Sequence, residues 1–221
     1  MRGRLPGGTR GGWVAGSDVC ESEVGFWLDK CCMPHVHPGL MGWCVGLLEE
    51  FIQLSNGLVV ILTWSYFERL WCVYEWACFL VCHEPRNIIL CADAFLRLTT
   101  LPFLIGSIKN FSLAGCKCAV ATDRSIVDGK IDAYYVSRYA FEDFLKFTAI
   151  ALIARDMAVR RTSLGAAAIL PWAELALECG FWDLAQRLYS LGDMTTAWRL
   201  EAAHGAGRAQ GWDMQTAIIN K

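Results

Sequence analysis

Candidate metal ligands gather in one short stretch of the sequence. Cys31 and Cys32 are followed by His35 and His37, and Cys44 lies a few residues beyond. Thiolate and imidazole groups are the ligands that zinc prefers, but the spacing here matches none of the standard structural zinc motifs. We therefore expect no metal site in this chain.

Asp29 is a second candidate for chemistry because of where it stands. The apolar run Val24–Leu28 before it predicts a short buried strand, and a loop containing Pro and Gly is expected from there to about Gly42. Open α/β sheets bind ligands at the carboxyl ends of their strands, so Asp29 could line a pocket. Capping the following loop is an equally suitable role for its carboxylate.

The elements after this loop predict an α/β sheet. Residues 43–54 have apolar side chains at helical spacing, and Asn56-Gly57 ends that helix. The run Leu58–Thr63 is β-branched and apolar, which is typical of an interior parallel strand covered on both faces. A helix over 68–82 and a strand over 87–91 follow. This alternation of strands and helices indicates parallel pairing through right-handed crossovers.

The pattern changes in the second half of the chain. We expect an edge strand within 113–120 and helices over 123–135 and 141–157. The last third is rich in Ala, Leu and Trp, with glycines placed to end its helices. It predicts a small helical appendage with three segments, which are 170–180, 182–191 and 194–203.

Composition limits the classes of function. The chain has 221 residues, 55% of them hydrophobic and 19% charged, with a formal net charge of −2. This balance excludes disorder for most of the chain and nucleic-acid binding through bulk charge. No apolar run is long enough for a transmembrane helix, and no secretory signal is present. The 11 cysteines are an odd number in apolar surroundings, so we expect reduced thiols and a cytoplasmic protein.

One segment resembles a known family. Tyr66, Trp71, Cys72 and Glu75 stand where TIR domains, the Toll/interleukin-receptor/resistance-protein family, have Tyr-x4-Trp-Cys-x-x-Glu, and Trp76 replaces the usual leucine. The chain is more similar still to a TIR-like group common in algae and dinoflagellates. The residues that carry this second likeness are Trp27-Leu28-Asp29-Lys30, Cys32, Tyr66-Phe67, Arg69 to Val73, Glu75, Phe111-Ser112, Cys116 and Asp123-Arg124.

The resemblance covers about Val24 to Ala149 and implies a flavodoxin-like parallel sheet. In catalytic members of the family, the glutamate of this motif cleaves the N-glycosidic bond of NAD, so Glu75 is the implied catalytic residue and NAD a substrate, with no cofactor. A carboxylate there can stabilise an oxocarbenium-like ribose. As a residue on an amphipathic helix, Glu75 could equally face solvent or pair with Arg69. Tyr66 and Trp71 are either aromatic contacts for the substrate or core residues.

The chain also departs from the family. TIR domains begin with a strand and a helix before the Trp-Leu-Asp-Lys strand, and neither element precedes Val24. The resemblance therefore implies an N-terminally truncated domain over 20–157, after a disordered Gly/Arg-rich leader at 1–19 and before a helical appendage at 158–221.

Two further interpretations stay open at this point. A non-catalytic TIR-like module would act in signalling by self-association or by binding other TIR-like domains, through helix surfaces and the loop after Asp29. A degenerate gene product would have no activity. A helical bundle unrelated to TIR domains requires that Leu58–Thr63 is not a strand.

Overall fold

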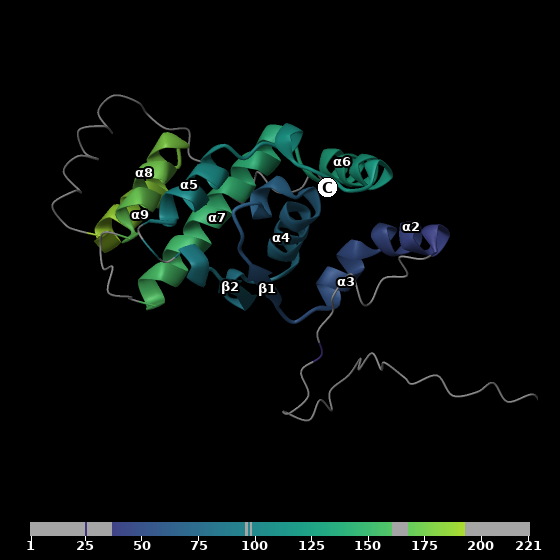
Figure 1. The fold of residues 1–221 in the computed structure, drawn as a ribbon, viewed down its shortest axis with the longest axis horizontal. Coiled ribbons are helices and arrows are strands. Elements are labelled where there is room, and N and C mark those ends of the chain that lie inside the picture. The colour runs from purple at the N-terminus through teal and green to yellow at the C-terminus, as the bar shows by residue number, and fades with distance from the viewer. Residues whose placement is uncertain (1–24, 26–36, 96, 98, 161–167, 193–221) are drawn as a thin grey trace, which may run out of the picture. The chain divides into compact units, whose positions relative to one another are not determined.

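The computed structural model describes residues 25, 37–95, 97, 99–160 and 168–192 (Figure 1). The chain divides into two compact units, residues 1–41 and 42–221. The predicted leader, the strand at Val24–Leu28 apart from Gly25, the metal-type residues Cys31 to His35 and the helix at 194–203 lie outside the described residues. The helices and strands are α2 (Pro38–Gly46), α3 (Leu48–Leu54), β1 (Leu58–Ile61), α4 (Leu70–Cys82), β2 (Ile88–Cys91), α5 (Leu101–Lys109), α6 (Ala121–Tyr134), α7 (Arg138–Arg160), α8 (Leu170–Glu178) and α9 (Trp182–Gly192).

Strands β1 and β2 form a parallel two-stranded sheet, with Leu58 opposite Ile88 and Ile61 opposite Cys91. Helix α4 connects the two strands. The segment from Leu70 forms a helix because it contains neither Gly nor Pro before Pro85, which lies beyond the end of the helix. The α/β class is therefore confirmed, and the interpretation as a helical bundle is wrong. The flavodoxin-like strand order stays a prediction.

Helix α4 is the centre of the core. Its residues Leu70, Val73, Trp76 and Phe79 are completely buried, and it packs against α3, α6 and α7. The inward side chains of the sheet are buried too; they are Val60, Leu62, Ile88 and Leu90. The opposite face is exposed, so the prediction of a strand covered on both faces is wrong for the described residues.

Several predicted boundaries differ from the structure. The loop expected as far as Gly42 already contains helix α2, because a proline is tolerated in the first turn of a helix. Helix α5 was not expected at all. The predicted edge strand at 113–120 is instead a short 3-10 turn at Leu113–Gly115, followed by one isolated parallel bridge between Arg69 and Lys117. The helices at 123–135 and 141–157 are confirmed; the first begins two residues earlier and ends one residue earlier than predicted, and the second extends three residues further at each end.

The predicted C-terminal helices are confirmed as far as residue 192. Between α8 and α9, Gly180 has φ of 81°, the Phe181 amide donates to the Ala176 carbonyl and the Gly180 amide donates to the Leu177 carbonyl. This is the Schellman geometry that ends a helix at glycine. Helices α8 and α9 pack on α7, within the same unit as the sheet. The expected domain boundary at 157/158 stays a prediction.

No helix among the described residues is long and apolar enough to cross a membrane. All cysteines in the described part of the chain are free thiols. The reduced state and the cytoplasmic location expected from the sequence both stay predictions.

Candidate functional site

Glu75 lies in the second turn of α4, half-buried, between the buried residues Tyr74 and Trp76. Trp71 is half-buried one turn before it, and residues four apart are neighbours on one face of a helix. Two of the predicted site residues therefore share the less buried side of an otherwise buried helix. Such a position lets a carboxylate reach a ligand while its backbone is held rigidly.

Tyr66 is buried in the short 3-10 turn Tyr66–Glu68 that precedes α4. Its hydroxyl donates a 3.1 Å hydrogen bond to the carbonyl of Cys72 in the first turn of that helix. Burial raises the pKa of the Tyr66 phenol, the electrostatic interactions with Cys72 and Glu75 raise it further, and the charge of Arg69 lowers it. The phenol and the Glu75 carboxylate thus lie within electrostatic reach of each other, and the ring of Tyr66 belongs to the core.

An aromatic cluster supports this part of the chain. The ring centroids of Tyr66 and Phe67 are 5.3 Å apart, and both lie about 6 Å from the ring of Trp76, at 6.1 and 6.2 Å. These are edge-to-face and tilted arrangements, which aromatic pairs prefer. The packing of these three aromatic rings therefore fixes the start of α4.

The carboxyl edge of the sheet lies beside the start of α4. Beyond β1 the pairing continues, because the Leu62 amide donates to the Cys91 carbonyl at 3.1 Å, and exposed Thr63 and Trp64 follow. Asp93 follows β2 at the same edge. Ligands of parallel sheets bind at this edge. Trp64 and Asp93 were not singled out from the sequence, although their positions just after apolar strands could have identified them.

The two motif segments of the resemblance meet in space. The Lys117 amide donates to the Glu68 carbonyl at 2.6 Å, and the Leu70 amide donates to the Lys117 carbonyl at 3.0 Å. An exposed ion pair of 2.8 Å joins the side chains of Glu68 and Lys117. The thiol of buried Cys116 lies 3.5 Å from the Phe67 carbonyl, and burial raises its pKa to about 12. This contact anchors the entry to α4.

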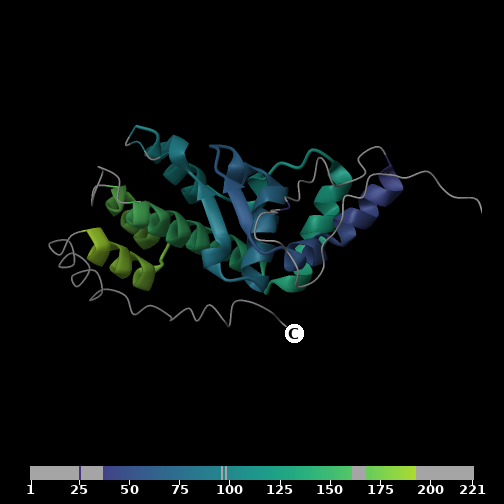
Figure 2. The same cartoon turned by 90° about the horizontal axis from the view of Figure 1, so that it is seen from below.

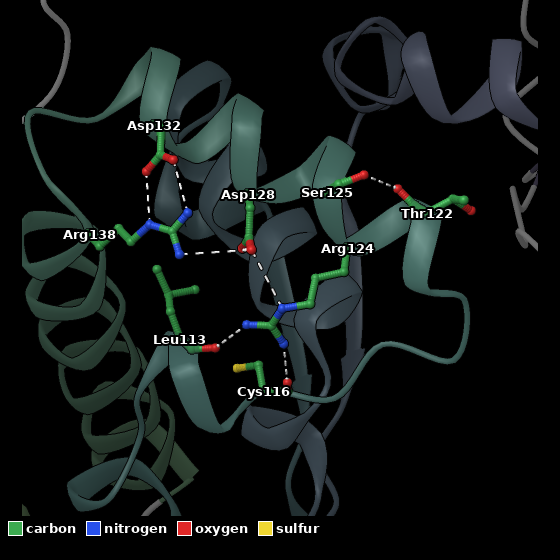
Figure 3. A network of polar contacts seen from close by, with 8 residues as sticks. All are labelled: Leu113, Cys116, Thr122, Arg124, Ser125, Asp128, Asp132 and Arg138. Atoms are coloured by element: carbon green, nitrogen blue, oxygen red, sulfur yellow. Dashed lines mark hydrogen bonds and ion pairs between the residues drawn. The ribbon is translucent and has the colours of Figure 1, made fainter.

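Arg124 of the Asp-Arg motif contacts the loop that contains Leu113 and Cys116 (Figure 3). Its guanidinium donates to the carbonyls of Cys116 and Leu113, at 2.5 and 2.9 Å, and lies 3.5 Å from the carboxylate of Asp128. Arg138 of α7 makes two 2.9 Å hydrogen bonds to Asp132 and approaches Asp128 at 3.8 Å. The network connects loop, α6 and α7, and its geometry is that of a structural clamp.

A partly buried polar cluster connects α3, α4 and α6. The Glu49 carboxylate accepts hydrogen bonds from the Tyr74 hydroxyl and from the Lys130 ammonium, and Lys130 also donates to the carbonyls of Val45 and Gly46. Burial is the main cause of the raised pKa of Tyr74. No sequence pattern indicated this cluster, because its members are more than 20 positions apart along the chain.

Asp29 lies outside the described residues. Within the described residues no group of His, Cys, Asp and Glu side chains could hold a metal ion. The structure thus brings Tyr66, Trp71 and Glu75 together around the first two turns of α4.

Comparison with known proteins adds no family. No protein-family model, no curated protein and no solved structure matches the chain.

Proposed function

We propose that this chain is a TIR-like enzyme that cleaves the N-glycosidic bond of NAD, with Glu75 as the catalytic carboxylate. The observation that carries the proposal is the placement of Glu75. It lies half-buried on a rigid helix, one turn from Trp71 and within electrostatic reach of Tyr66. The motif resemblance supplies the substrate.

The reaction requires a negative charge beside the ribose of NAD. As the bond between C1′ of the ribose and N1 of nicotinamide breaks, its electron pair neutralises the pyridinium nitrogen and positive charge develops on the ribose. A water oxygen then bonds to C1′ and releases a proton, giving nicotinamide and ADP-ribose. A carboxylate beside the ribose stabilises the developing charge, and removing such a group typically costs 10²- to 10³-fold in rate.

The aromatic residues have different roles in this proposal. Trp71 retains exposed surface on the Glu75 face and is the side chain available to contact a nicotinamide or adenine ring. Tyr66 is buried and bonded to the Cys72 carbonyl, so we assign it to positioning α4. Trp64 and Asp93 at the carboxyl edge are additional candidates for substrate contact.

A non-catalytic interaction module is the second candidate, and a different observation favours it. The sheet has an apolar face that the described helices do not cover, and exposed apolar patches mark binding surfaces. Glu75 would then be a structural residue with no effect on binding.

Nicotinamide release from NAD, followed by chromatography, tests the first candidate. The wild-type chain should release nicotinamide, and Glu75→Gln should reduce the rate at least about 100-fold. Glu84→Gln is the matched control, because exposed Glu84 pairs with Arg86 beyond the end of α4. Equal rates for wild type and Glu75→Gln would exclude Glu75 as the catalytic group.

A further inference from the structure

Residues 113–118, which we call the strap, lie along the entry to α4. The Lys117 amide donates to the Glu68 carbonyl at 2.6 Å, and the Leu70 amide donates to the Lys117 carbonyl at 3.0 Å. Leu70 is the first residue of α4, and the first N–H groups of a helix have no partner within the helix. The strap supplies one of those partners, so its position determines where the first turn of α4 lies.

Side chains from two other helices hold the strap. The Arg124 guanidinium of α6 donates to the Leu113 carbonyl at 2.9 Å and to the Cys116 carbonyl at 2.5 Å (Figure 3). The Glu142 carboxylate of α7 accepts a 2.7 Å hydrogen bond from the Leu113 amide. Figure 2 shows α7 behind the two strands of the sheet, and both belong to the same compact unit. The strap therefore connects the entry of α4 to the helical part of that unit.

Arg124 spans the strap, because its two donors reach carbonyls three residues apart. Asp128, one turn further along α6, lies 3.5 Å from the guanidinium and orients it. Both side chains are partly buried, at 30% and 21% exposure. A planar guanidinium fork can hold two acceptors at a fixed separation, which an ammonium group cannot do. Removing the guanidinium would free the strap immediately before Lys117.

We infer that Arg124 is a positioning residue for Glu75, and that it acts through the backbone of the strap. Arg124 fixes the strap, the strap fixes the first turn of α4, and Glu75 follows in the second turn of that helix. This inference rests on the proposed cleavage of NAD, in which Glu75 must lie beside the ribose. A misplacement of about 1 Å can cost about 100-fold in rate, so a loose strap should slow the reaction.

Steady-state nicotinamide release by Arg124→Ala tests the inference. We expect kcat to fall at least about 10-fold and KM to change less than about 3-fold, because the carboxylate is misplaced while the binding surface remains. Arg155→Ala is the matched control. The exposed Arg155 guanidinium also donates to a backbone carbonyl, that of Pro85 at 3.3 Å, but beyond the end of α4. Its kcat should equal that of the wild type, and equal kcat values for Arg124→Ala and the wild type would overturn the inference.

Free guanidinium ion distinguishes lost positioning from lost stability. Millimolar guanidinium should restore part of the kcat of Arg124→Ala, because the ion can bind where the side chain was removed. Guanidinium weakens folded proteins in general, so the recovery could not come from a larger folded fraction. The same concentrations should not raise the kcat of wild type or Arg155→Ala. A kcat of Arg124→Ala that stays low at every concentration would indicate lost stability and overturn the inference.

Hydrogen exchange separates failure of this inference from failure of the proposed function. If the wild type releases no nicotinamide, the proposed function fails, and exchange in Arg124→Ala alone decides whether Arg124 positions Glu75. Faster exchange confined to residues 67–76 and 113–118 would support the inference. Unchanged exchange in residues 67–76, or faster exchange throughout the chain, would overturn it. Arg124→Lys is the second variant if Arg124→Ala does not fold, and it should show the same local change because it lacks the fork.

Discussion

The indole nitrogen of Trp76 donates a 3.0 Å hydrogen bond to the hydroxyl of Thr148, 72 positions away on α7. Thr148 in turn donates to the Phe144 carbonyl at 2.9 Å. Trp76 occupies the position where TIR-like motifs carry leucine, and a buried indole needs an acceptor for its N–H. Helix α7 supplies that acceptor, so the departure from the motif is compensated within the fold. The bond also fixes the residue next to Glu75.

Trp76→Phe should lower the free energy of unfolding by about 2–3 kcal/mol, because it removes buried volume and leaves the Thr148 hydroxyl short of a donor. Thr148→Val should cost about 1–2 kcal/mol. Urea denaturation of both variants and of the double variant measures their coupling. The double variant should lose less than the sum, since one bond is removed in both; strict additivity would mean that the two residues do not interact.

Lys130→Met should destabilise the chain by about 2 kcal/mol, because the Glu49 carboxylate and the carbonyls of Val45 and Gly46 lose a partly buried partner. Urea denaturation again provides the measurement. Lys117→Met is the control: its ion pair with Glu68 is exposed, so the free energy of unfolding should change little. Equal losses of unfolding free energy in Lys130→Met and Lys117→Met would contradict a stabilising role for the cluster of Glu49, Tyr74 and Lys130.

Arg124→Lys should destabilise the loop that anchors α4. A lysine ammonium cannot reproduce the guanidinium fork that donates to both Leu113 and Cys116, so about 1–2 kcal/mol should be lost. Hydrogen exchange followed by mass spectrometry should show faster exchange in residues 113–118. Arg86→Lys, which changes an exposed pair, should leave exchange there unaltered. Unchanged exchange in Arg124→Lys would exclude the clamp.

Cys78 should contribute to a loss of stability at alkaline pH. Burial raises its pKa to about 12 from an ordinary 9.0, with the charge of Glu49 adding to the rise and the hydrogen bond from Tyr74 opposing it. The unfolded chain therefore loses this proton first, and stability that is complete below about pH 9 falls as pH rises toward 12. Urea denaturation at about pH 7.5 and about pH 10.5 should show a smaller decline for Cys78→Ala than for wild type. An identical decline would contradict a buried, neutral thiol.

Local sequence patterns were sufficient for part of the fold. The apolar run at Leu58 and the helical spacing from Leu70 to Cys82 depend on neighbours in the chain, and both elements are present. The prediction of a loop as far as Gly42 is wrong because a proline such as Pro38 can start a helix, and α2 begins there. The open sheet face could not be predicted, since apolar alternation does not reveal which surface covers a strand.

The candidate site was predictable to a similar extent. The motif placed Tyr66, Trp71 and Glu75 at one end of α4, and the helix brings the last two onto one face. The burial of Tyr66 and its bond to the Cys72 carbonyl depend on how the turn before α4 packs. Its assignment as a core residue therefore needed the structure. The Glu49 and Lys130 pair likewise arises only when α3 and α6 meet α4.

The most direct test of the central claim compares steady-state NAD cleavage by wild type and Glu75→Gln. A carboxylate that acts on the charge of the transition state should lower kcat at least about 100-fold when it is replaced, while KM changes less than about 3-fold. An unchanged melting temperature would show that the loss is chemical rather than structural. If kcat is the same in both proteins, or if wild type releases no nicotinamide, the assignment of Glu75 as the catalytic carboxylate is wrong.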